Sequence, residues 1–289
     1  MKMLNFGKMT MTAFILGILA VGNVQAGQCS LIPNDTINIK EYEIQQLLRN
    51  GKFLQLEEIL EKLHRKNLTS DGGDLLTSRM ISLILIPQNE NSLQMWIDQR
   101  PQSFFAQLST GIFYFNHAAY ARGYKFISET SPAQLAEMNK IDEKAVGYLQ
   151  KAMQLDPHSA LPQGVLLGIA AREDEAAGKN AAQWLQAANQ ADPKNLAARI
   201  KAVNFLSPRW GGSFELLDQM VEQAKKSLPS QSNNYLEFEV IMEKASHEEV
   251  IVKDKQKAYE LYKRAKDMCE NSEAAQNGII RTYQPKNSN

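Results

Sequence analysis

Apolar residues recur at helical spacing along most of the chain. In the segment 53–66, for example, large apolar residues follow one another three and four positions apart, and the segment ends in basic residues, as helix C-termini often do. No stretch alternates between apolar and polar residues over the length of a strand, so we expect an all-α protein without a sheet. Before residue 140 the pattern predicts helices over 42–48, 53–66, 75–86, 93–99 and 104–122, with a loop over 67–73.

From residue 140 onward a four-residue pattern repeats. A small residue, a large one and a second small one stand four and three positions apart, and a proline follows five positions later. The small residues let a neighbouring helix approach, the large one fills the space between helices, and the proline ends the helix. Ser159 and Asn195, two residues past the first two prolines, are expected to cap the helices that follow. The copies are Ala145, Leu149, Ala152, Pro157; then Ala181, Leu185, Ala188, Pro193; then Leu217, Val221, Ala224, Pro229; and last Ala258, Tyr262, Ala265, Glu270.

These residues resemble the second helix of the tetratricopeptide repeat, although Leu217 replaces the first alanine in one copy and the last copy lacks the proline. The pair Leu167 and Gly168 also matches a position of that repeat's first helix. The first three copies begin 36 residues apart, rather than about 34, and the fourth follows after 41. Sel1-like repeats fit the longer period, so both subtypes stay open. The resemblance implies a superhelical array of antiparallel helix pairs, a solenoid in which each pair buries its apolar face against its neighbours.

Two further signatures lie outside the generic repeat: Arg122-Gly123 after the long aromatic helix, and the Pro-Arg-Trp-Gly-Gly-Ser stretch at 208–213. Together with the Asp-Pro pairs of the repeats, they resemble an uncharacterised bacterial family of helical-repeat domains, for which no activity is implied. The stretch at 208–213 has a structural interpretation, in which Ser213 caps the next helix and Trp210 fills the space between helices. It also has a binding interpretation, because Arg209 and Trp210 belong to residue types that are enriched in interface hot spots.

The first 26 residues are typical of a secretory signal peptide. Lys2 and Lys8 precede a short apolar run, and Ala26 ends a small-x-small cleavage pattern. The apolar run is about 12 residues long, whereas a bilayer-spanning helix needs about 20. We therefore expect cleavage near Ala26, secretion to a bacterial periplasm and no membrane insertion of the mature chain. The predicted organisation is a signal peptide at 1–26, an N-terminal helical region at 27–139, and tetratricopeptide-like repeats with a C-terminal capping helix at 140–289.

The two cysteines, Cys29 and Cys269, both lie in the expected mature chain. An oxidising compartment allows a disulfide between them, which would close a loop of about 240 residues and contribute about 5 kcal/mol in the chain-entropy model. Two unpaired thiols are the alternative, with Cys269 simply buried on a helix.

Composition and motifs exclude several classes of function. Basic and acidic residues number 32 each, so no overall positive field attracts nucleic acid. The four histidines show no metal-ligand spacing, and no phosphate-binding glycine loop occurs, so we expect neither a metal nor a cofactor. One alternative remains a hydrolase-type enzyme that uses His117, Arg122 and Glu129. Another is a binder of an envelope polymer or small ligand through Tyr114, Tyr120 and Tyr124.

A non-enzymatic protein that binds a protein partner, as an adaptor, chaperone or antidote, fits these observations best. A stacked helical array offers a long concave surface, which the first helix of each pair should line. The candidate partner-binding residues on this surface and in the 208–213 stretch are Arg172, Glu173, Lys201, Arg209 and Trp210.

Overall fold

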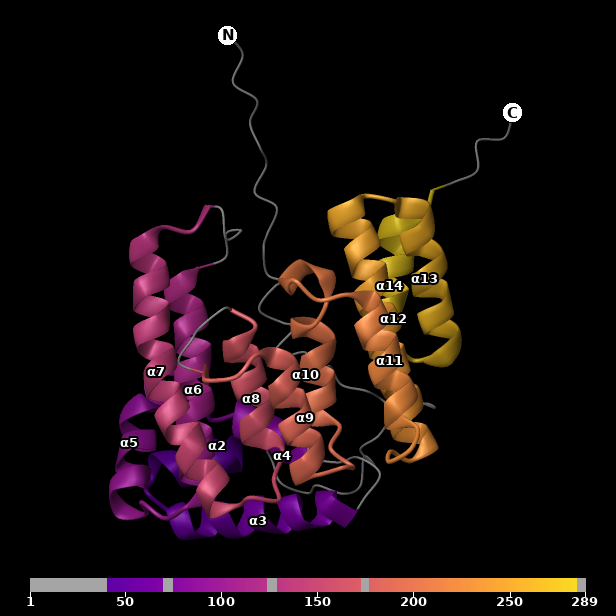
Figure 1. Ribbon diagram of the computed structural model, residues 1–289. Coiled ribbons are helices and arrows are strands. Elements are labelled where there is room, and N and C mark those ends of the chain that lie inside the picture. Colours follow the sequence, from indigo (N-terminus) through magenta and orange to yellow (C-terminus); the bar gives the residue numbers. More distant parts are fainter. Residues whose placement is uncertain (1–40, 70–74, 124–128, 173–176, 285–289) are drawn as a thin grey trace, which may run out of the picture.

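The computed structural model describes residues 41–69, 75–123, 129–172 and 177–284, and in these residues it is all-helical. The predicted fold class is therefore confirmed at this level, and no strand occurs in the described ranges. Figure 1 shows the helices in chain order, from the N-terminal helices at the base to α13 and α14 at the other end of the molecule. The helices are α2 (Glu41–Arg49), α3 (Phe53–Thr69), α4 (Leu75–Ser82), η2 (Pro87–Asn89), α5 (Glu90–Gln99), α6 (Phe104–Arg122), α7 (Pro132–Leu155), α8 (Leu161–Ala170), α9 (Ala181–Ala191), α10 (Ala197–Phe205), η5 (Pro208–Trp210), α11 (Phe214–Ala224), α12 (Ser230–His247), η6 (Glu248–Val252), α13 (Lys255–Met268) and α14 (Glu273–Thr282).

Short polar side chains start several of these helices, as local chemistry requires. Ser103 accepts a hydrogen bond from the Ala106 N–H at the start of α6, and Ser213 does the same for the Leu216 N–H at the start of α11. Ser131 and Asn180 each form a capping box, at the start of α7 and α9. The predicted cap at Ser213 is thus confirmed.

The two caps predicted after the repeat prolines differ from this expectation. The Asn195 side chain donates to the Asp192 carbonyl at 2.6 Å and to the Ala188 carbonyl, so it closes the end of α9 and does not cap α10. Ser159 accepts a hydrogen bond from the Leu161 N–H at 3.3 Å but lies one residue before the N-cap of α8. Both side chains therefore stabilise the turn itself.

Most of the repeated small and large residues are buried where helices meet, whereas Ala181 and Leu185 of the second copy are partly exposed. Ala152, Ala188 and Ala224 are 0–1% exposed. The other small and large residues of the first and last copies are 0–2% exposed. On the facing side of α6, a Cβ on Gly111 would lie only 2.8 Å from the Leu149 side chain. Small residues on one helix thus accommodate large residues on the next, as the pattern predicts.

Helix contacts follow a regular order through the second half of the chain. The helices α6, α8, α10 and α12 each contact the next one in this series. In the second series, α7 contacts α6 and α8, α9 contacts α8 and α10, α11 contacts α10 and α12, and α13 contacts α12 and α14. We call α6, α8, α10 and α12 the inner row; of the binding residues expected on the first helices, Arg172 lies directly after α8 and Lys201 lies on α10.

The N-terminal helix α3 lies across the ends of the following helices (Figure 1). It continues through Thr69, beyond the loop that the sequence predicts from residue 67, while α4 ends at Ser82, short of the predicted residue 86. The buried His64 of α3 lies 3.2 Å from the Asp156 carboxylate, measured from Nε2 to Oδ2, in the turn after α7. Stacking on Phe104 and edge contact with Phe105 hold the imidazole in place.

Residue 140 lies inside α7, which runs without interruption from Pro132 to Leu155. The proposed signal peptide and Cys29 lie outside the described residues. Cys269, at the C-terminal end of α13, is buried and disulfide-bonded. Its pairing with Cys29 stays a prediction.

Candidate partner-binding site

Three aromatic rings form a continuous series between the inner-row helices. The Phe115 ring on α6 lies 6.2 Å from the Phe205 ring on α10, and the Phe205 ring lies 5.4 Å from the Trp210 ring on η5, between ring centroids. Phe115 and Phe205 are buried, whereas Trp210 is partly exposed. We call these three residues the aromatic ladder.

Gly168 on α8 makes this contact between α6 and α10 sterically possible. A Cβ at this position would lie 2.9 Å from Phe115 Cζ and 3.0 Å from Phe205 Cε2. Any larger residue would push the two rings apart, since both are already buried. The Leu-Gly pair noted in the sequence therefore has a direct packing role at the centre of the inner row.

A buried ion pair lies beside the first ring of the ladder. Arg172, just after α8, is 3.2 Å from Asp142 on α7, measured from Nη1 to Oδ2, and the two side chains are 4% and 0% exposed. The guanidinium also donates to the Phe115 carbonyl at 3.3 Å and lies over the Phe115 ring, with Cζ 4.1 Å from the centroid. The charge of Arg172 is thus balanced inside the protein.

Lys201 on α10 approaches the same ring but has no such balance. Its ammonium nitrogen lies 5.3 Å from the Phe115 centroid, and within the described ranges no carboxylate pairs with it. The side chain is partly exposed. Limited hydration by the surrounding protein, together with the nearby positive charge of Arg172, lowers the pKa of Lys201 to about 8.

The 208–213 stretch brings its arginine and tryptophan to the far end of the ladder. Gly211 adopts φ +81, and a Cβ on Gly212 would lie 1.9 Å from the Leu206 carbonyl oxygen, so each glycine of the pair has its own steric reason. Arg209 pairs with Glu243 on α12 at 2.9 Å, from Nε to Oε1. The structural interpretation of this stretch is therefore confirmed, and Trp210 still keeps an exposed surface.

Carboxylates of α12 lie beyond the end of the ladder. Desolvation raises the pKa of Glu243, and the Arg209 guanidinium opposes that rise. Desolvation also raises the pKa of Glu239, opposed only by the Tyr235 hydroxyl. The series of inner-row side chains thus has the ammonium group of Lys201 beside Phe115 and desolvated acidic groups on α12.

Four of the five predicted binding residues therefore lie along one series of contacts. Arg172 and Lys201 share the Phe115 ring, and Arg209 and Trp210 lie at the other end of the ladder. Glu173 lies outside the described residues. Sequence reasoning missed Phe115, Asp142, Phe205, Glu239 and Glu243. One available signal was the seven-residue spacing between Phe115 and Arg122, which places both on the same face of α6.

The residues of the alternative enzyme hypothesis are not brought together. His117 is exposed and lies against Phe113, whereas the Arg122 guanidinium carbon lies 5.9 Å from the Trp210 ring centroid, on another side of α6. Glu129 is exposed, and no hydrogen bond or ring contact joins the three among the described residues.

The tyrosines of the ligand-binding alternative are also dispersed. Tyr114 stacks on Tyr148 of α7, with the ring centroids 5.7 Å apart, while Tyr120 is exposed on α6. Tyr124 lies outside the described residues. Across the described ranges, no group of three histidine, cysteine or carboxylate side chains is placed to hold a metal ion, and none of the helices there has the length and apolarity to cross a bilayer.

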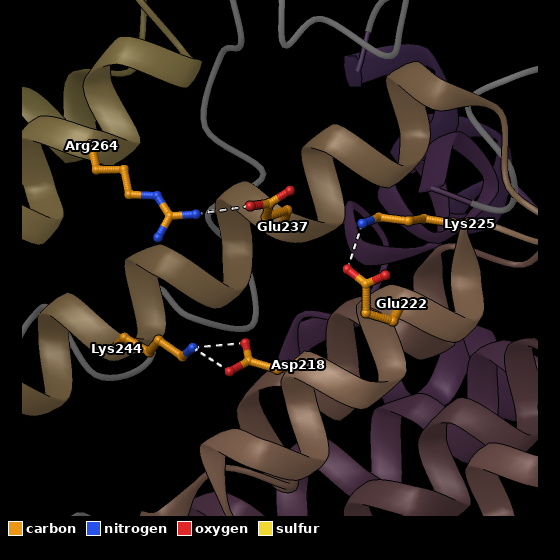
Figure 2. A network of polar contacts seen from close by, with 6 residues as sticks. All are labelled: Asp218, Glu222, Lys225, Glu237, Lys244 and Arg264. Atoms are coloured by element: carbon orange, nitrogen blue, oxygen red, sulfur yellow. Dashed lines mark hydrogen bonds and ion pairs between the residues drawn. The ribbon is translucent and has the colours of Figure 1, made fainter.

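The opposite side of α12 carries a different kind of charge arrangement. Figure 2 shows three ion pairs on α11, α12 and α13: Asp218 with Lys244, Glu222 with Lys225, and Glu237 with Arg264. Each cation here has its own carboxylate, and each pair is at least partly exposed. These pairs are ordinary surface interactions and provide matched controls for the inner row.

The site defines the protein as an all-helical domain whose adjacent helices share one series of aromatic and charged side chains. The chain belongs to the family described as Domain of unknown function (DUF4034), whose model matches residues 40–169 and 159–241. The matched residues include the whole ladder and the three residues around Phe115, whereas Glu243 lies just beyond them. No curated protein matches the chain.

Proposed function

We propose that this protein is an exported, non-enzymatic helical-repeat protein that binds another protein through its inner row. The chain is secreted to the periplasm by the leader at 1–26, and the mature part acts as an adaptor, chaperone or antidote-like binder. No cofactor or metal takes part in this function.

The order of helix contacts supports a solenoid of tetratricopeptide-like or Sel1-like pairs. Each inner-row helix contacts the next, and each helix of the second series contacts the two inner helices on either side of it. The small and large residues of the repeat are buried at these contacts, except for Ala181 and Leu185, which are partly exposed. In such an array the inner helices line the concave side, which is the surface that repeat proteins use for extended ligands.

One observation carries the proposal: partly exposed aromatic and charged side chains from α10 and η5 lie on a rigid base formed by α6, α7 and α8. Lys201 and Trp210 retain solvent exposure, while Phe115, Asp142 and Arg172 beneath them are buried and mutually satisfied. A partner that covers Lys201 and Trp210 therefore meets an ordered surface and loses little conformational entropy there. Tryptophan and cationic side chains over aromatic rings are strong contributors when water is excluded.

Site-directed photo-crosslinking tests the location of this surface. A benzoylphenylalanine in place of Trp210 should yield one dominant adduct with a periplasmic protein when the cells are irradiated. The matched control carries the same group in place of Leu216, which is exposed on α11. Circular dichroism melting of both variants checks that they fold.

The proposal fails if neither position yields a protein adduct under varied growth conditions. It also fails if Leu216 captures the same protein as efficiently as Trp210, because the surface would then not be the inner row.

A further inference from the structure

We infer that the Lys201 position on the inner row binds a side-chain carboxylate from an acidic segment of the partner protein, and that apolar residues flank this carboxylate. This inference rests on the proposed function and specifies the chemistry of the partner.

The charges around Phe115 leave one position for an anion. Asp142 neutralises Arg172, and Nη1 of the same guanidinium also donates to the Phe115 carbonyl, so the charge of Arg172 is balanced within the protein. Lys201 is the cation that remains, and the described residues supply it with an aromatic face but with no carboxylate. A partner carboxylate restores the balance that Asp142 gives to Arg172.

The chemistry of a single lysine favours a carboxylate over a phosphate. Phosphate groups are recognised chiefly by several donors at once, often by the planar fork of arginine, and here Nη1 of Arg172 already serves Asp142 and the Phe115 carbonyl. One ammonium group with three donors suits a singly charged acceptor. The partial burial of Lys201 strengthens this pairing, because a charged hydrogen bond is worth more where the effective dielectric constant is low.

The neighbouring aromatic residues define what surrounds the carboxylate. The ladder continues from Phe115 through Phe205 to the partly exposed Trp210, so apolar side chains next to the acidic residue have rings to cover. The desolvated carboxylates Glu239 and Glu243 lie farther on, on α12. Glu243 already occupies the guanidinium of Arg209 at that end, so the partner's acidic residue is directed to Lys201.

The experiment uses the mature full-length chain with its lysine side chains isotope-labelled at Cε. The probe is a blocked peptide, acetyl-Ala-Leu-Glu-Phe-Ala-amide, and two control peptides replace Glu with Gln or with Lys. Substitution Lys201→Met assigns the Lys201 signal in the NMR spectrum. We expect the Glu peptide, at millimolar concentration, to shift this signal and to raise the pKa of Lys201 toward its ordinary value of 10.5. The Gln peptide should bind about tenfold more weakly or worse, and the Lys peptide should not bind.

Variants separate this subsite from general attraction of acidic peptides. Lys201→Met should abolish the preference for Glu over Gln, and Lys201→Arg should retain part of it. Lys225→Met, which removes an exposed and already paired lysine directly after α11 (Figure 2), should leave the preference unchanged.

Equal binding of the Glu and Gln peptides overturns the inference, as does an unperturbed Lys201 signal with all peptides or a preference that survives in Lys201→Met. Each of these results can occur while crosslinking at Trp210 still identifies a protein partner. In that event the proposed function stands and only the acidic-segment chemistry is lost.

Discussion

The close packing at Gly168 gives a quantitative test of the inner row. Substitution Gly168→Ala adds one methyl group, whose carbon would lie 2.9–3.0 Å from atoms of Phe115 and Phe205. Because both rings are buried, they must shift to accept it, and overpacking of this kind costs about 1–3 kcal/mol. Alanine also favours the helix over glycine by about 1 kcal/mol, which offsets part of that cost.

Gly147 provides the matched control, because it lies within α7 and a Cβ there meets nothing within 4 Å. Gly147→Ala should therefore stabilise the protein by about 0.5–1 kcal/mol. The helix-propensity gain is common to both variants, so the difference between them isolates the steric term. We expect Gly168→Ala to be less stable than Gly147→Ala by about 1–3 kcal/mol.

Urea unfolding of the two variants and the wild type, followed by circular dichroism at 222 nm, measures this difference. The denaturant slope should stay constant, because the substitution alters packing and not the surface that unfolding exposes. If Gly168→Ala proves as stable as Gly147→Ala, then Phe115 and Phe205 are not pressed together across α8, and the ladder is wrong.

Three further substitutions test individual charges, each by urea unfolding. Asp142→Asn leaves Arg172 buried without its carboxylate and should destabilise the protein by about 3–5 kcal/mol. The double change Asp142→Leu with Arg172→Met should recover most of this loss. A single variant that loses little stability would contradict the pairing. The hydrogen bond from His64 holds the pKa of Asp156 below its ordinary 3.8, so Asp156→Asn should lower stability at pH 7. The difference in stability between this variant and the wild type should shrink as the pH falls below about 4. A difference that does not change with pH would refute this cause. Lys201 binds its proton less well in the folded state than in the unfolded state, so Lys201→Met should be more stable than wild type at pH 7, and this advantage should disappear as the pH rises from about 8 to 10.5.

The helices were predictable because each one satisfies a local rule. Apolar spacing located most of them, and Ser213 capped the helix that its position indicated. Boundaries were less accurate where the local signals conflict with packing. The sequence Asn-Leu-Thr at 67–69 has turn chemistry, yet it continues α3. Asn195 has the chemistry of an N-cap, but the carbonyls left open at the end of α9 lie within its reach and take its amide instead.

The candidate site was predictable only in part. The expected first helices of the pairs indicated Arg172 and Lys201, since the repeat register places them on successive helices. The sequence did not indicate that both would share the ring of Phe115, because that residue lies in an aromatic run and is buried like its neighbours. Asp142 lies 30 residues before Arg172, and nothing in the chain between them marks the pair. Contacts of this kind depend on how three helices pack, which no single segment encodes.

The position of α3 affects how the whole molecule can deform. Stacked helix pairs usually bend by small rotations at each interface, so that the array stretches and twists like a spring. Here His64 of α3 contacts Asp156 in the turn after α7, and its ring packs on Phe104 and Phe105 of α6. A rotation of α7 against α6 has to displace α3 from at least one of these contacts. We therefore expect the elasticity of the molecule to be concentrated in α11–α14, beyond the reach of this crosswise helix, while the half that carries Phe115 behaves as a rigid body.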